Sequence, residues 1–186
     1  MASTGPIAFE NYSDDSAVGT ETWSSVLNAE ASDDSRATVS LTETQSHYLK
    51  GLFCDWAEPP ADGDTIDGIE ISIERSTDGG GGVVVDAVVR LVKAGTVVGD
   101  NKASGLAWPT TDGTATYGGA ADLWGTTWTA AEVKATNFGV VLSAQENLGL
   151  TTVARIDLIT AKLYYTPAAG GGPRVTHRRI SNLRRM

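Results

Sequence analysis

Acidic residues are the most numerous side chains in this chain that could bind a metal or act in catalysis. Three short motifs place two of them close together: Asp14-Asp-Ser16, Asp33-Asp-Ser35 and Asp62-Gly-Asp64. Paired carboxylates serve as general acid and base, and carboxylates in loops can bind Ca²⁺. Asp, Ser and Gly are also common turn residues, and 23 acids bring some pairs together by number alone. We therefore expect no catalytic residues, no metal site and no cofactor, with a loop-bound Ca²⁺ as the alternative.

Motifs of the common enzyme classes are absent from the sequence. It contains no Walker loop, dinucleotide fingerprint, HExxH pair, nucleophile elbow or EF-hand loop. Cys54 is the single cysteine and is expected to be a small buried residue of a strand. These observations predict a protein that is not an enzyme.

Two tryptophans, Trp124 and Trp128, are the most conspicuous aromatic pair in a chain with few aromatics. They precede Thr129-Ala-Ala-Glu132, a capping-box pattern that predicts a short helix over about 129–135. Burying such rings stabilises a fold, so the two side chains are predicted to plug one end of the core. The alternative is that they contact a glycan, together with Trp23, Trp56 or Trp108.

The remaining sequence predicts an antiparallel β-sandwich. Ile66–Arg75 alternates isoleucines with polar residues, which is typical of a half-buried strand. Further strands are expected over the ranges 37–43, 48–54, 83–93, 96–98, 137–143 and 153–165, with the first two paired and the glycines 79–82 at a hairpin tip. In the last strand Asp157 shares the parity of Ile159, which indicates a bulge or an edge position. Jelly-roll and immunoglobulin-like topologies both fit this all-β pattern.

Charge and glycine content divide the chain. We expect an N-terminal arm over residues 1–22, the sandwich over 23–167, a Gly-rich linker over 168–173 and a basic arm over 174–186. The C-terminal arm contains no acid and five arginines: Arg174, Arg178, Arg179, Arg184 and Arg185. The rest of the chain contains nine basic and 23 acidic residues. Such an arm favours an acidic protein surface, whereas nucleic-acid binding is not expected from so acidic a body. The sequence shows neither a long apolar span nor a secretory signal, so no membrane role is expected.

Several segments, in the same order along the chain, resemble a family of small proteins encoded by tailed bacteriophages and prophages. They include Glu21–Ala29, Ile66–Arg75, Val97–Ala103, Tyr117-Gly-Gly and Asp122-Leu-Trp-Gly, and the similarity spans roughly residues 20–167. The resemblance implies a virion structural component, either a capsid decoration (cement) protein or a part of the tail or its fibres. It implies no catalytic residues, and residues 168–186 lie outside it.

The sequence therefore predicts a virion protein that binds the major capsid protein or sister subunits. A homo-oligomer is expected, with a trimer favoured because capsid sites have local symmetry. The arginines of residues 174–186, or the N-terminal segment, would make the contact. A tail or fibre protein, or a module that binds host-surface glycans, is the alternative function.

Overall fold

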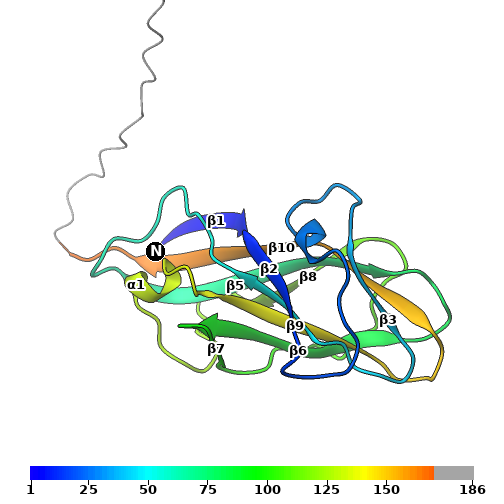
Figure 1. Cartoon of the computed structure of the whole chain (residues 1–186). Helices are drawn as coiled ribbons and strands as arrows, with labels where there is room; N and C mark the ends of the chain where they lie inside the picture. Colours follow the sequence, from blue (N-terminus) through cyan, green and yellow to red (C-terminus); the bar gives the residue numbers. More distant parts are fainter. Residues whose placement is uncertain (170–186) are drawn as a thin grey trace, which may run out of the picture.

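The computed structural model describes residues 1–169 and shows two packed β-sheets (Figure 1). The first sheet has the order β1-β10-β5-β8, and β3 also pairs with β10 beyond the end of β1; the second has the order β2-β4-β9-β6-β7. All strand pairs are antiparallel. The strand bounds are β1 Ala2–Ala8, β2 Asn11–Asp15, β3 Ala37–Leu41, β4 Tyr48–Leu52, β5 Thr65–Thr77, β6 Val84–Lys93, β7 Thr96–Val98, β8 Gly113–Gly118, β9 Gly139–Glu146 and β10 Thr152–Thr166.

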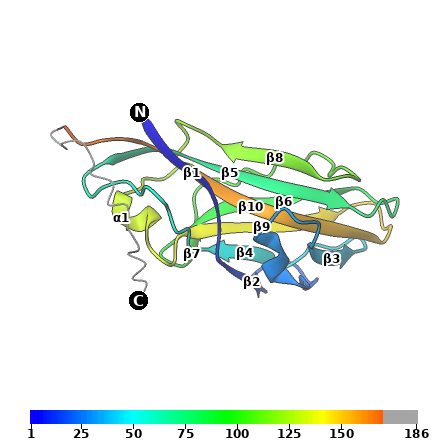
Figure 2. The ribbon, with the colours of Figure 1, turned by 90° about the horizontal axis from the view of Figure 1, so that it is seen from above.

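Strands β3 to β10 are connected as a jelly roll. They give the orders β3-β10-β5-β8 and β4-β9-β6-β7, in which successive strands from β3 to β6 alternate between the two sheets. Figure 2 shows the two layers with β8 at the outer edge of the first. The predicted all-β sandwich is confirmed, and the connectivity is that of the jelly roll.

The core lies between the sheets and follows the period-two alternation of the strands. Ile69, Ile71 and Ile73 of β5 are fully buried, as their spacing predicts. β9 is buried on both faces along most of its length. A smaller apolar cluster around Tyr48, Val92 and Val141 covers its second face.

Residues 1–22 do not form the separate arm that the sequence predicts. Strand β1 pairs with β10 in the first sheet, and β2 pairs with β4 in the second. Phe9 and Tyr12 are buried in the core between them. Only these few apolar residues anchor the segment, so it lacks the periodic pattern that identifies a strand.

Two predicted hairpins are also wrong, because the jelly-roll connections cross between sheets. The strands over 37–43 and 48–54 lie in different sheets as β3 and β4, rather than side by side. The glycines 79–82 likewise link β5 of the first sheet to β6 of the second. Turn residues show where the chain reverses but not whether it stays in its sheet.

Bulges explain the two irregular strands. The register between β5 and β10 shifts between Ile156 and Leu158, so the predicted bulge at Asp157 is confirmed. A second shift, between Asp86 and Val88 of β6, was not foreseen. It turns Asp86 inward and leaves Val85 and Ala87 only half-buried, contrary to the simple alternation.

The predicted capping box is present. Helix α1 (Ala130–Val133) begins after Thr129, whose hydroxyl accepts a hydrogen bond from the Glu132 N–H, while the Glu132 carboxylate accepts one from the Thr129 N–H. The helix is shorter than the predicted 129–135. A 3₁₀ turn, η1 (Val26–Ala29), is the other helical element within residues 1–169.

Candidate functional site

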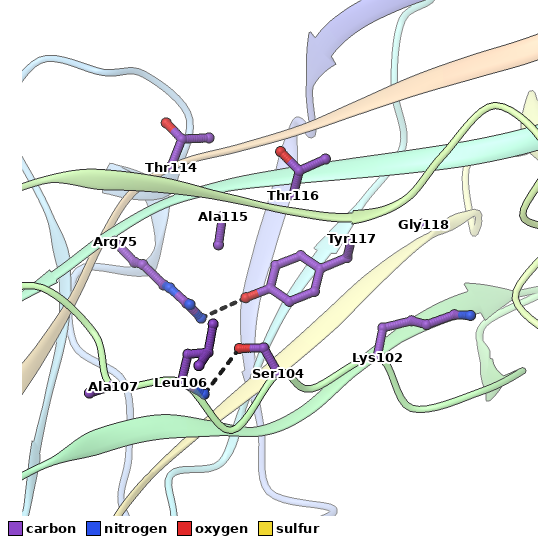
Figure 3. Close-up of a pocket in the computed structure, with 10 residues that line it drawn as sticks. All are labelled: Arg75, Lys102, Ser104, Leu106, Ala107, Thr114, Ala115, Thr116, Tyr117 and Gly118. Carbon is purple, nitrogen blue, oxygen red and sulfur yellow. Dashed lines mark hydrogen bonds between the residues drawn. The ribbon is translucent and has the colours of Figure 1, made fainter.

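A buried cluster of polar residues joins the two sheets beneath a surface groove, whose lining residues are drawn in Figure 3. Arg75 comes from the end of β5, Tyr117 from the edge strand β8 and Asp86 from β6 of the opposite sheet. Trp108 and Ser104 come from the loop between β7 and β8. The β6 bulge is what brings Asp86 into this cluster.

Asp86 receives hydrogen bonds on both carboxylate oxygens. Oδ1 accepts from the Arg75 guanidinium and from the Trp108 indole at 2.9 Å, and Oδ2 accepts from the Ser104 hydroxyl at 2.9 Å. The Ser104 N–H and the Tyr117 hydroxyl donate to Oδ2 as well, at 3.2 and 2.8 Å. These five donors occupy both carboxylate oxygens, so no lone pair of Asp86 is left to act as a base.

Arg75 balances that charge and is held between aromatic rings. Its guanidinium carbon lies 5.1 Å from the centre of the Trp108 ring and 5.8 Å from that of Tyr117, which favours cation–π attraction. Burial, followed by the nearby Asp86 carboxylate, raises the pKa of Tyr117 well above its usual value, so its hydroxyl stays neutral. The cluster therefore ties the sheets together and offers no nucleophile.

The groove above the cluster has a volume of about 480 Å³ and runs along β8. Strand β8 forms one side and the loop containing Leu106 forms the other, as Figure 3 shows. Its lining contains two cations and no carboxylate: Arg75, Lys102, Ser104, Leu106, Ala107, Thr114, Ala115, Thr116, Tyr117 and Gly118. Lys102 forms an ion pair with Asp122 at 2.8 Å.

Elsewhere, carboxylates anchor loops by accepting backbone N–H groups. Glu146, fully buried, accepts from Glu43, Val83, Leu148 and Gly149 at 2.7–3.3 Å. Burial raises the pKa of Glu146, but the four backbone donors together lower it by more, so the pKa lies below its usual value. Asp157 accepts from Asp33 and Asp34, and Asp78 accepts from Gly80 and Val153.

Two of the three acidic motifs of the sequence also have local partners. Asp14 contacts His47 Nδ1 at 2.7 Å and accepts the Trp23 N–H. Asp62 pairs with Lys134, and Asp64 accepts the N–H groups of Ala61 and Ala168. These contacts explain why Asp-rich turns are common here without requiring a metal.

In the part of the chain that the structure describes, one group of carboxylates lies close enough together to hold a cation. Ligand oxygens of Asp34, Asp112 and Asp157 lie within 4.8 Å of one another. Arg36 forms ion pairs with both Asp34 and Asp112, and holds the pKa of Asp112 below its usual range. The guanidinium thus supplies the positive charge that this acidic group needs.

Trp124 and Trp128 point into the core. Trp124 is fully buried and donates its indole N–H to the Ile69 carbonyl at 2.9 Å, and Trp128 packs edge-on against Phe138. A Cβ on Gly118 would lie 2.5 Å from the Trp124 indole nitrogen, so glycine is needed there. All five tryptophans, which fall within residues 1–169, are at most 6% exposed.

The other predicted residues divide by location. Cys54 is buried as expected, but it lies two residues beyond the end of β4 rather than in a strand, and burial raises the pKa of its thiol. The arm arginines Arg174, Arg178, Arg179, Arg184 and Arg185 lie outside the described residues, as does most of the predicted linker.

Sequence reasoning missed the groove and the cluster under it. One signal was available: Asp86 stands alone between valines in Val83-Val-Val-Asp-Ala-Val-Val89, and a charge in such a run needs a buried partner. Strand β8 was missed because Gly113–Gly118 is short and lies between turn-forming residues.

The fold and these contacts define a jelly-roll β-sandwich whose internal acids serve its architecture. Within residues 1–169 no helix has the length and apolar character of a membrane span. No protein-family model matches the chain, and no curated protein matches it significantly.

Proposed function

We propose that this protein is a structural component of a tailed-bacteriophage particle, acting as a capsid decoration protein. In this role it binds the major capsid protein and stabilises the shell. The observation that carries the proposal is the use of inward-facing acids to fix loops, with Glu146 and Asp86 as the clearest cases. Such a body presents a defined surface to a neighbour without rearranging.

Two further points support this role. Segments spread over residues 20–167 resemble small phage-encoded proteins, and jelly rolls occur in viral capsid proteins and lectins. Fold alone does not define function, so this second point is an analogy. Glycan binding through a flat aromatic face is disfavoured, because all the tryptophan rings are buried.

The proposed contact with the shell involves charge. The described body contains nine basic and 23 acidic residues, whereas the arm over 174–186 contains five arginines. We propose that these arginines bind an acidic surface of the capsid protein or of a sister subunit. Such binding weakens with added salt, because exposed charges are screened.

Cryo-electron microscopy of particles produced by the phage that encodes the chain tests the proposal. We expect copies distributed over the shell at local symmetry axes. Copies confined to the tail would replace decoration with the tail role, and particles without the protein would overturn the virion proposal.

A binding assay tests the arm separately. Particles lacking the protein are incubated with the full chain or with a variant ending at Ala169, and the pelleted fraction is compared. We expect the truncated variant to bind more weakly, while its circular dichroism stays unchanged. Equal binding would remove the arm from the contact.

A further inference from the structure

The outer edges of the two sheets differ in how they are protected. β3 is covered, since Ser24 and Thr38 exchange backbone hydrogen bonds of 2.8 and 3.0 Å. β1 contains Pro6 and a register shift, β2 contains two aspartates, and β7 has three residues. Prolines, charges, bulges and short length all discourage a foreign strand from pairing.

Strand β8 has none of these protections. Its six residues, Gly-Thr-Ala-Thr-Tyr-Gly, include no charge and no proline, and its pairing with β5 has no register shift. Its other edge pairs with no strand in the part of the chain that the structure describes.

The hydrogen-bond alternation shows which groups face that open edge. Gly119 donates its N–H to the Ile69 carbonyl of β5 at 3.1 Å. In an antiparallel ladder every second residue bonds to the same neighbour, so Tyr117 and Ala115 also bond to β5. The N–H and C=O groups of Thr114, Thr116 and Gly118 then point outward, along the groove.

The groove provides room and an apolar contact beside these groups. Leu106, on the opposite side, is 69% exposed and offers an apolar contact beside the strand edge. Thr114 and Thr116 are exposed on the other face of the strand, as Figure 3 shows by their direction away from Tyr117. An added strand would pair with β8 and cover Leu106.

We propose that the added strand is β8 of a second copy, paired antiparallel about a two-fold axis through Thr116. In this register Thr116 pairs with its own counterpart, and Thr114 pairs with Gly118 of the other copy. The outward backbone groups of the central Thr116 pair are then satisfied, because such a pair exchanges two hydrogen bonds. Gly118, with a left-handed φ of 74°, ends the regular ladder. The Thr116 side chains meet as a cross-strand threonine pair.

Charge favours a second copy at this place. Two identical acidic bodies repel each other, and they approach at least cost where carboxylates are absent. The groove lining contains no acid and β8 is uncharged, and the nearest carboxylates on the exposed face, Glu70 and Glu74 of β5, lie one strand back from the contact. The strand is also self-complementary, which a two-fold contact requires. This proposal does not rest on the virion role.

Sedimentation equilibrium of the full chain tests the pairing through two variants at one position. Thr116→Pro removes an outward N–H but no hydrogen bond to β5, whereas Thr116→Ala keeps the N–H. We expect a concentration-dependent dimer for the wild type and for Thr116→Ala, and a dissociation constant raised by about tenfold or more for Thr116→Pro. A wild-type monomer or trimer, or an unaffected Thr116→Pro dimer, would overturn the proposal.

Cross-linking tests the register without relying on proline. Opposed residues of a hydrogen-bonded pair have Cα atoms about 5.5 Å apart, which suits a disulfide. Cys54 is buried, so an introduced thiol is the accessible one. We expect Thr116→Cys to form a disulfide-linked dimer under mild oxidation, and Thr96→Cys, at the start of β7, to form no covalent dimer. Equal cross-linking at both positions, or none at Thr116, would contradict the two-fold register.

Discussion

Asp86 and Glu146 are both buried carboxylates, yet the molecule balances their charges in different ways. Asp86 faces a guanidinium and lies between the two sheets, where it joins β6 to β5 and β8. Glu146 has no cation partner within residues 1–169 and accepts four backbone N–H groups from three loop segments. An ion pair thus ties layers together, and a set of backbone dipoles ties loops to a strand end.

The largest expected effect comes from removing the cation of the first site. Arg75→Ala leaves Asp86 buried beside neutral donors, which typically costs about 3–5 kcal/mol of the free energy of unfolding. Urea unfolding followed by tryptophan fluorescence measures this loss. Arg155→Ala, a half-buried arginine without a carboxylate ion pair, is the control and should cost much less. A loss below about 1 kcal/mol for Arg75→Ala would show that the neutral donors suffice.

The same site allows a test of whether charge itself is needed. Replacing both partners, Arg75→Met with Asp86→Leu, removes the desolvated charges together. We expect the double variant to be more stable than Arg75→Ala, measured in the same urea experiment. A double variant as unstable as the single one would mean that Tyr117, Trp108 and Ser104 depend on the carboxylate for their positions.

The second site should respond locally rather than globally. Glu146→Gln replaces one acceptor oxygen with an NH₂ group, so at least one of the loop N–H groups loses its partner. We expect hydrogen exchange to accelerate at Glu43, Leu148 and Gly149, with a smaller loss of stability than for Arg75→Ala. Unchanged exchange at these amides would show that the loops keep their conformation without the hydrogen bonds to Glu146.

Strand periodicity allowed most of the strands to be predicted, but not the partners of each strand. Ile66–Arg75 was identified because one face is buried along its whole length. β1, β2 and β8 were missed, since their burial depends on single residues such as Phe9, Tyr12 and Tyr117. Long-range packing decides to which sheet a strand belongs, and the local residue pattern carries no information about it.

The candidate site was harder to predict because its residues are far apart in sequence. Arg75, Asp86 and Tyr117 meet through the jelly-roll crossing and through a bulge in β6. The bulge at Asp157 was predictable, since an acid stood at an inward position of an otherwise regular strand. The same reasoning at Asp86 would have identified a buried charge but not the arginine that balances it.

The smallest expected effect on stability comes from replacing Asp112, an acid near the surface that pairs with Arg36. The Arg36 guanidinium lowers the pKa of Asp112, so this ion pair stabilises the fold fully above the unfolded pKa of about 3.9 and loses its contribution as pH falls through the folded pKa. Asp112→Asn should therefore cost about 0–1 kcal/mol at pH 7 and less at pH 3, and added salt should reduce the pH 7 cost. Urea unfolding of both proteins at the two pH values measures the difference. A cost that persists unchanged at pH 3 would assign the role of Asp112 to its 2.7 Å hydrogen bond from Ser76 rather than to charge.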